Sequence, residues 1–192
     1  MTELILASTS KYRKELLGRL ELPFRCVAPG VNEELLKQKG LKPKVLAQEL
    51  ALLKAQSVAK KHPNAIIIGS DQVAAIDELI LDKPGDRTTA FKQLSLMQGR
   101  EHFLFTAVAV ITPSQEIQFI DTTTLSMKNL TDEQINRYLD RDEPFDCAGS
   151  YKIETSGISL FESVVSEDFT AITGLPLIIL SKYLQKLGYD LP

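Results

Sequence analysis

The sequence has few residues of the kinds that build metal clusters and disulfide frameworks, with two cysteines and two histidines among 192 residues. Cys26 and Cys147 lie far apart, and so do His62 and His102, so no pair has the short spacing of a zinc or iron–sulfur site. We therefore expect two buried thiols in a reducing cytoplasm.

An excess of positive charge and a long apolar run are also missing. Acidic residues number 25 and basic ones 22, so we expect no broad cationic surface for nucleic acid or anionic lipid, and an anionic ligand would need a local pocket. The N-terminus carries Glu3 in place of a basic region, and the longest apolar run, residues 175–180, contains Pro176. These features predict a cytoplasmic protein that is neither secreted nor embedded in a membrane.

The composition that is present fits a globular protein, with 44% hydrophobic and 24% charged residues. No internal repeat or linker interrupts the chain, so residues 1–192 are expected to form one domain of mixed α/β class. Hydrophobic periodicity and turn residues predict strands at residues 4–7, 23–27, 65–68, 79–81, 102–112, 117–128 and 157–165, and after the polar residues 69–72 the apolar character resumes through Ile76. Helices are predicted after Ser10, over residues 43–61, after Thr88 or Thr89, from the capping box at 131–134 to Leu139, and over residues 177–187.

The stretch ILASTSKYR, residues 5–13, raises the first question about function. An apolar strand ends at Ser8, Thr9 and Ser10, and the following helix carries Arg13 in its first turn. Free backbone N–H groups at a helix start bind phosphate, and a guanidinium fork suits phosphate oxygens. The alternative is an ordinary capped helix whose charges face solvent.

Asp71 is the second unusual position, because it interrupts the apolar run of residues 66–76. Burying a carboxylate there is costly unless it is paired, binds a metal or lines a cleft. The alternative is a turn aspartate that accepts hydrogen bonds from local amides. Lys54, on an otherwise apolar helix, and Lys83, in a Lys-Pro-Gly turn, are each typical of solvated surface charges when taken singly.

Several ordered pieces of the chain resemble the Maf family of nucleoside triphosphate pyrophosphatases along nearly its whole length. These pieces are LILASTSKYR, PGVNEE, LLKAQSVA, IIIGSDQVAAI, LDKP, and FDCAGSYKIE leading into ITGLPL. The variants GSDQV and CAGS are similar to the branch of the family that acts on 7-methyl-GTP. The resemblance implies hydrolysis of the α–β phosphoanhydride to a nucleoside monophosphate and diphosphate, with a divalent cation, Mg²⁺ or Mn²⁺, as cofactor.

The resemblance also implies a fold and a set of site residues. The fold is the two-lobed α/β structure of the Maf and ITPase type, with a long central mixed sheet flanked by helices, a substrate cleft between the lobes and a homodimeric assembly. By position, the implied roles are phosphate binding by Ser8, Arg13, Lys54 and Lys83, metal binding by Glu33 and Asp71, and proton acceptance by the catalytic Asp71.

The resemblance further implies that three positions select the base of the nucleotide. In this chain they are Tyr12, Gln72 and Glu154. Relatives that hydrolyse dTTP and UTP have arginine, threonine and glutamine there. Methylation at N7 makes guanine cationic, which suits an aromatic face, and a carboxylate can accept from the N1 and N2 donors. The alternatives are a dTTP/UTP-type or broad-range pyrophosphatase, and a nucleotide-binding regulator of septum formation with little turnover.

Some positions depart from the family pattern. Asn32 replaces a common aspartate, which puts the number of metal-binding carboxylates in doubt, and Leu53 replaces an arginine that often precedes Lys54. Thr106 is followed by alanine in place of the frequent glycine. Asp71 is intact, so these departures do not indicate a loss of activity.

Overall fold

The computed structural model describes residues 2–192 and shows an α/β protein with a seven-stranded mixed sheet. The strands are β1 Leu4–Leu6, β2 Arg25–Cys26, β3 Ile66–Ile76, β4 Leu79–Ile80, β5 Glu101–Ile111, β6 Glu116–Met127 and β7 Phe161–Val165. The α-helices are α1 Lys11–Gly18, α2 Glu34–Lys37, α3 Pro43–Ala59, α4 Arg87–Met97, α5 Asp132–Asp142 and α6 Leu177–Lys186. Short 3-10 helices cover Ala148–Ser150, Ser156–Leu160 and Ala171–Thr173. The predicted α/β class and mixed sheet are confirmed.

The strand order of the sheet is β2-β1-β3-β5-β6-β7, and β4 pairs with the end of β3. β1 is parallel to both β2 and β3, whereas β4 is antiparallel to β3 and β7 is antiparallel to β6. The residues of β3 that interrupt its apolar run lie inside one continuous strand, so Asp71 is a strand residue and the alternative of a turn aspartate is wrong.

The chain divides into two compact units. Unit 1 comprises the residues up to Gln72 together with Thr106–Asp121 and Asp168–Pro192, and unit 2 comprises Val73–Phe105 and Thr122–Glu167. The long strands β3, β5 and β6 contribute residues to both units. The two-lobed arrangement with a substrate cleft stays a prediction.

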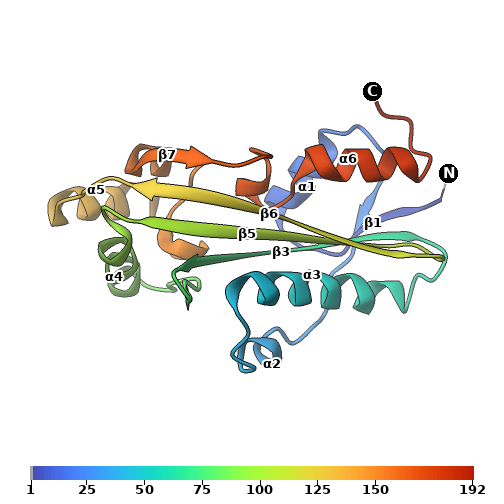
Figure 1. Ribbon diagram of the computed structural model, residues 1–192, viewed down its shortest axis with the longest axis horizontal. Coiled ribbons are helices and arrows are strands. Elements are labelled where there is room, and N and C mark those ends of the chain that lie inside the picture. Colours follow the sequence, from blue (N-terminus) through green and yellow to red (C-terminus); the bar gives the residue numbers. More distant parts are fainter. Residues whose placement is uncertain (1) are drawn as a thin grey trace. The chain divides into compact units, whose positions relative to one another are not determined.

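The sheet of unit 1 has an apolar layer on each face. Leu4 and Ile68 face a core shared with α1 and α6, whereas Ile5 and Ile67 face a second core with Ala55 and its neighbours on α3. Figure 1 shows α3 along one face of these strands, with α1 and α6 on the other. A strand segment covered by apolar layers on both faces is apolar on both sides, which explains the β-branched residues 66–68 at the start of β3.

Two predicted boundaries in unit 2 are wrong. Helix α4 is capped by Asp86 and not by Thr88 or Thr89: Asp86 Oδ1 accepts from the Thr89 amide at 2.9 Å. A carboxylate at this position also interacts favourably with the helix dipole. The predicted strand over residues 157–165 begins only at Phe161, because residues 156–160 form a 3-10 helix in which a Cβ on Gly157 would lie 2.3 Å from the Lys152 carbonyl oxygen.

The predicted burial of both cysteines is also wrong. Cys26 is exposed because it lies on β2, a two-residue strand at the edge of the sheet, and Cys147 is partly buried. Burial, with a contribution from the neighbouring Asp146 carboxylate, raises the pKa of the Cys147 thiol to about 12. Over residues 2–192, each helix is too short or too polar to cross a membrane.

Candidate functional site

A buried ammonium group joins two carboxylates in unit 1. Lys54 Nζ donates to Asp71 Oδ1 at 2.5 Å and forms an ion pair with Glu33 Oε1 at 2.9 Å. Lys54 and Asp71 are 6% and 7% exposed, whereas the Glu33 side chain is 41% exposed. The reading of Lys54 as a solvated surface charge is therefore wrong, and Asp71 is a buried carboxylate with the partner that burial requires.

The cluster depends on how closely α3 approaches β3. A Cβ built on Gly69 would lie 2.3 Å from the Ala51 carbonyl oxygen and 2.8 Å from Ala55 Cβ, so only glycine fits this position of the strand. The two alanines lie on either side of Lys54 on the helix face that packs on the sheet. This close contact brings the lysine from one element within bonding distance of Asp71 on the other.

The start of α1 has the predicted geometry. Ser10 is the N-cap, and its Oγ accepts from the Arg13 amide at 3.4 Å. Ser8 is buried, and its Oγ accepts from the Ser10 amide at 3.1 Å. Ser8, Ser10 and the first turn of α1 thus gather hydroxyl and amide groups at the positive end of a helix dipole, an arrangement suited to an anion.

Arg13 is held in place by a backbone carbonyl. Its Nε donates to the Gly174 oxygen at 3.0 Å, and Ser70 Oγ donates to the same oxygen at 2.8 Å. Burial lowers the pKa of Arg13, while the negative charges of Asp71 and Glu33 act in the opposite direction. Because Nε is engaged, the two terminal nitrogens of the guanidinium are the groups left to bind phosphate oxygens.

Gln72 is oriented by three acceptors. Its Nε2 donates to Thr106 Oγ1 at 2.9 Å, to the Ala171 oxygen at 2.9 Å and to the Ile172 oxygen at 3.0 Å. Thr106 Oγ1 in turn donates to the Ala171 oxygen at 2.9 Å, so it can only accept from the amide. The two amide hydrogens are therefore shared among three acceptors, and the carbonyl oxygen is the group of Gln72 left for a further hydrogen bond.

The remaining candidate residues differ in their surroundings. Tyr12 is partly buried, and Lys11 Nζ lies 4.9 Å from the centre of its ring. Lys83 and Glu154 belong to unit 2 and are both exposed. The structure brings Glu33, Lys54 and Asp71 into direct contact, and no such contact joins Lys83 or Glu154 to another candidate residue among those described.

Three residues that help to build this site have no predicted role in it from the sequence. Gly69 permits the close helix contact, the Gly174 carbonyl holds Arg13, and Thr106 orients Gln72. Gly174 lies in the stretch ITGLPL. Thr106 stands out in the sequence only because alanine follows it in place of the glycine frequent in the family. A backbone carbonyl leaves no residue signature, so Gly174 could be found only through its glycine, which has a φ of 107°.

Comparison with known proteins identifies the family of the chain. A family model described as Maf-like protein matches residues 3–187. This chain belongs to the Maf family. A protein of Xanthomonas oryzae pv. oryzae (strain MAFF 311018), named 7-methyl-GTP pyrophosphatase, is 48% identical over 192 residues, which is all of both chains.

Two further relatives carry the same name. The protein from Bdellovibrio bacteriovorus is 48% identical over 183 residues, covering 95% of this chain and 96% of its own length. The protein from Polaromonas sp. is 46% identical over 190 residues, covering 98% of this chain and 86% of its own length. The predicted membership of the Maf family is confirmed, and the roles of individual residues stay predictions.

Proposed function

We propose that this Maf protein is a nucleoside triphosphate pyrophosphatase that converts 7-methyl-GTP to 7-methyl-GMP and pyrophosphate. The full-length similarity to proteins named 7-methyl-GTP pyrophosphatase supports this substrate. The observation that carries the chemistry is the buried contact of Asp71 with Lys54, next to Glu33. It combines a proton acceptor, a cation for phosphate oxygens and a second carboxylate in one place.

In the proposed step, a water oxygen attacks the α-phosphorus while Asp71 takes the water proton. The bond from the α-phosphorus to the bridging oxygen breaks, and pyrophosphate leaves with the electron pair. Lys54 bonds Asp71 through Oδ1, which leaves Oδ2 as the acceptor for the water proton. Arg13 and Lys54 neutralise the charge that develops on the leaving group, and the Maf resemblance assigns Lys83 the same role.

The carboxylates of Glu33 and Asp71 fit a divalent metal. Both reach the same ammonium group, at 2.9 and 2.5 Å, so they are close enough to share one cation. Among residues 2–192 no group of three or more His, Cys, Asp and Glu side chains could hold a metal ion, so further ligands would come from phosphate oxygens and water. A bound Mg²⁺ or Mn²⁺ would acidify the attacking water and share the phosphate charge.

Base selection is assigned to Tyr12, Gln72 and Glu154. Stacking of a cationic base on the Tyr12 ring would contribute roughly 0.5–2 kcal/mol. Because its amide hydrogens are already engaged, Gln72 is left as an acceptor, which suits the donor edge of guanine. Glu154 would accept from N1 and N2 while its charge opposes that of the methylated ring.

Pyrophosphate release by the purified chain tests the function. 7-methyl-GTP, GTP, dTTP and UTP are compared with Mg²⁺ and with Mn²⁺, and we expect the highest kcat/KM with 7-methyl-GTP. A preference for dTTP or UTP would support a pyrimidine-type enzyme instead. Tight nucleotide binding without turnover on any substrate would support a nucleotide-binding regulator.

A triple substitution tests the base assignment separately. Replacing Tyr12, Gln72 and Glu154 with arginine, threonine and glutamine adds one positive charge and removes one negative charge, which disfavours a cationic base. We expect the ratio of kcat/KM for 7-methyl-GTP to that for dTTP to fall by about tenfold or more. An unchanged order of preference across the same nucleotides would contradict the assignment.

The same proposal includes the assembly and the surroundings of the enzyme. By the Maf resemblance, the residues assigned to the nucleotide include Arg13 and Lys54 of unit 1 and Lys83 and Glu154 of unit 2. Residues 1–192 thus act as one catalytic domain, in the cytoplasm and as a homodimer. Light scattering coupled to size-exclusion chromatography tests the homodimer, and a monomer at every concentration would contradict it.

A further inference from the structure

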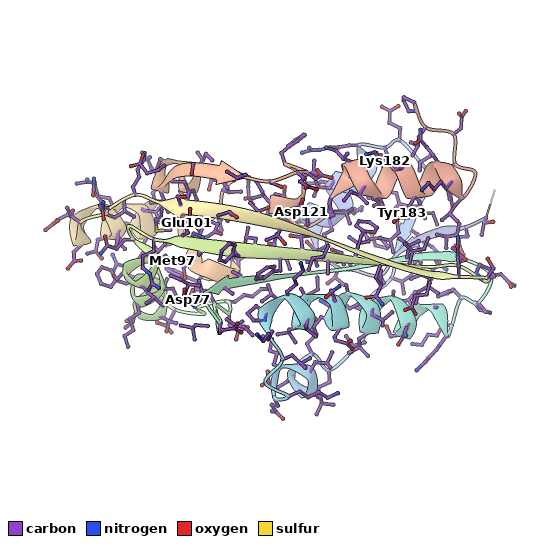
Figure 2. The ribbon with its side chains drawn as sticks, in the orientation of Figure 1. Asp77, Met97, Glu101, Asp121, Lys182 and Tyr183 are labelled. Carbon is purple, nitrogen blue, oxygen red and sulfur yellow. The ribbon has the colours of Figure 1, made fainter. Side chains whose placement is uncertain are left out.

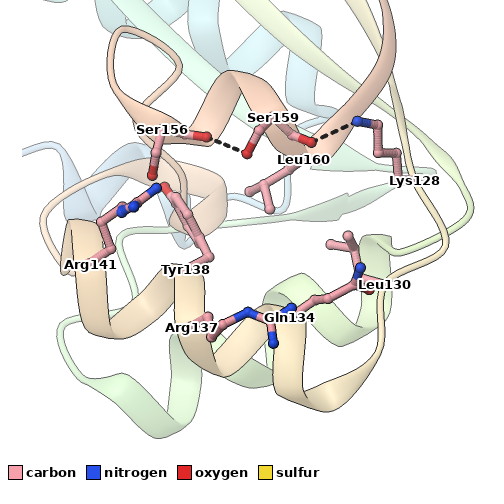
Figure 3. Close-up of a pocket in the computed structure, with 9 residues that line it drawn as sticks. All are labelled: Lys128, Leu130, Gln134, Arg137, Tyr138, Arg141, Ser156, Ser159 and Leu160. Carbon is pink, nitrogen blue, oxygen red and sulfur yellow. Dashed lines mark hydrogen bonds between the residues drawn. The ribbon is translucent and has the colours of Figure 1, made fainter.

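Unit 2 contains a pocket of about 460 Å³ that the proposed function does not use. One face of α5, the 3-10 helix Ser156–Leu160 and the residues that follow β6 line it (Figure 3). Its volume lies within the range of about 300–1,000 Å³ that is typical of small-molecule sites. Leu130 and Leu160 supply the apolar part of its lining.

The polar lining of this pocket is cationic. Lys128, Arg137 and Arg141 line it, and none of its lining residues is acidic, although the whole chain has a net charge of −3. Figure 3 shows Arg141 beside Tyr138 and Arg137 beside Gln134. Three positive charges in one concave site are therefore a local feature and do not reflect a basic protein.

The arginines of the pocket form no ion pair with a carboxylate among the described residues. The Glu133 carboxylate, one turn before Arg137 on α5, is attracted by the charge of Arg137 but does not form an ion pair with it. The nearby Asp142 carboxylate is engaged instead by the hydroxyls of Thr155 and Ser156, at 2.7 and 2.6 Å. Both guanidinium groups are thus available to a ligand.

Lys128 is positioned by its surroundings. Its Nζ donates to the Ser159 carbonyl oxygen at 3.0 Å, which uses one of its three hydrogens and leaves two for a ligand. Arg137 and Arg141 are four residues apart on α5, so they are neighbours on one helix face. Two planar forks one turn apart can bind the oxygens of adjacent phosphates, with Lys128 as a third positive charge.

We infer that this pocket binds a small molecule that carries a diphosphate group. The concave shape and apolar wall favour a compact ligand over an extended polymer, and the net negative charge of the chain disfavours a nucleic acid. The inference depends only on unit 2 and does not require the proposed catalytic function.

The test is an amide NMR titration with inorganic pyrophosphate in EDTA, so that no divalent cation is present. We expect saturable shifts in the amides of residues 134–141 and 156–160. The double variant Arg137→Gln with Arg141→Gln should weaken this binding by about tenfold or more, because charge-assisted hydrogen bonds are lost. Inorganic phosphate should bind the unmodified chain more weakly than pyrophosphate, because it offers oxygens to only one fork.

The matched control is Lys182→Gln with Lys186→Gln, which removes the same two charges from exposed positions on α6 of unit 1. We expect less than about a twofold change in affinity for this variant. Equal weakening in both variants would assign the effect to net charge alone and overturn the inference. Shifts that do not saturate, or that are confined to residues around Arg13 and Lys54, would also overturn it. If the double variant does not fold, Arg137→Gln alone is compared with Lys182→Gln.

Discussion

The two units bury different kinds of polar side chain. The buried charged residues of the described chain, all in unit 1, are Lys54, Asp71, Asp121 and Asp168; Figure 2 labels Asp121, the last β6 residue of that unit. The buried polar residues of unit 2 are His102, Thr123 and Ser150. Burying a charge is costly without a partner, so unit 1 must hold its charges in fixed contacts, whereas unit 2 buries groups that remain neutral.

Charge burial in unit 1 has two distinct outcomes. Asp168 accepts from the Ile178 amide at 2.5 Å and from the Thr170 hydroxyl and amide at 2.6 and 3.0 Å, so hydroxyl and amide donors, one of them in the first turn of α6, stabilise its charge. Asp71 meets an ammonium group instead, with a second carboxylate beside it. The first arrangement stabilises a helix terminus, and the second leaves carboxylate oxygens and N–H groups that can act on a ligand.

The largest expected effect is that of Asp71→Asn, which keeps the shape of the side chain and removes its basicity. We expect single-turnover hydrolysis of 7-methyl-GTP to slow by about 10²–10⁴-fold, because a general base is lost. Nucleotide binding should remain, since Arg13 and Lys54 are unchanged. The matched control is Asp77→Asn, an exposed residue of unit 2 that pairs with Arg100. Single-turnover rates equal to those of the unmodified chain would exclude Asp71 as the base.

Lys54 of unit 1 and Lys83 of unit 2 are both predicted to bind phosphate but differ in burial, so their variants compare the two units directly. Lys54→Gln leaves the buried Asp71 carboxylate without its ammonium, so the free energy of unfolding should fall by about 3 kcal/mol. Lys83→Gln changes an exposed side chain in a turn and should alter stability by less than about 0.5 kcal/mol, while it raises the KM for nucleotide. Urea denaturation of both variants provides the comparison. Equal losses of stability would show that burial of Lys54 is not what distinguishes the two.

The third prediction concerns the neutral core of unit 2. His102 is buried against Tyr151 and Phe161, its Nε2 lies 3.1 Å from the Tyr151 hydroxyl, and burial lowers its pKa to about 4. An unfolded histidine has a pKa of about 6.5, so the unfolded state binds a proton first as the pH falls. The stability from this site is present above pH 6.5 and is lost between pH 6.5 and about 4.

The size of this effect follows from the same shift. Between pH 7 and pH 5 the free energy of unfolding should fall by about 2 kcal/mol from His102 alone. His102→Phe should remove that part of the pH dependence, and His62→Gln, at a partly exposed histidine, should leave it. The measurement is urea denaturation at both pH values. A pH dependence that His102→Phe leaves unchanged would contradict neutral burial of the imidazole.

Hydrophobic pattern and turn residues predicted most of the fold because each element carries its own signal. The periodicity of α3, the capping box of α5 and the buried run of β3 are local, and all three elements were found. The boundary errors fall where one short-range contact overrides the hydrophobic pattern, as in the 3-10 helix whose Gly157 closely approaches the Lys152 carbonyl oxygen.

In the candidate site the limit is different, because contacts distant in sequence decide the outcome. Sequence pattern alone assigned Lys54 to the surface, because the pattern of a helix does not show which strand it packs on. The resemblance to the Maf family named Lys54 and Asp71 together, and the structure places them in contact. The partners that orient them were missed, since Gly69, Thr106 and the Gly174 carbonyl act through packing and single hydrogen bonds.

The smallest expected effect tests one of these missed contacts. Thr106→Val keeps the side-chain shape but removes the hydroxyl that accepts from Gln72 and donates to the Ala171 carbonyl. Gln72 then loses one of the three acceptors that share its two amide hydrogens, and we expect the KM for 7-methyl-GTP to rise by about fivefold, equivalent to about 1 kcal/mol, with kcat within about twofold. Thr122→Val, at an exposed β6 residue of unit 2, should change neither constant. If Thr106→Val lowers kcat and leaves KM unchanged, the threonine does not act by orienting a base-binding glutamine, and its hydrogen bonds serve the chemical step.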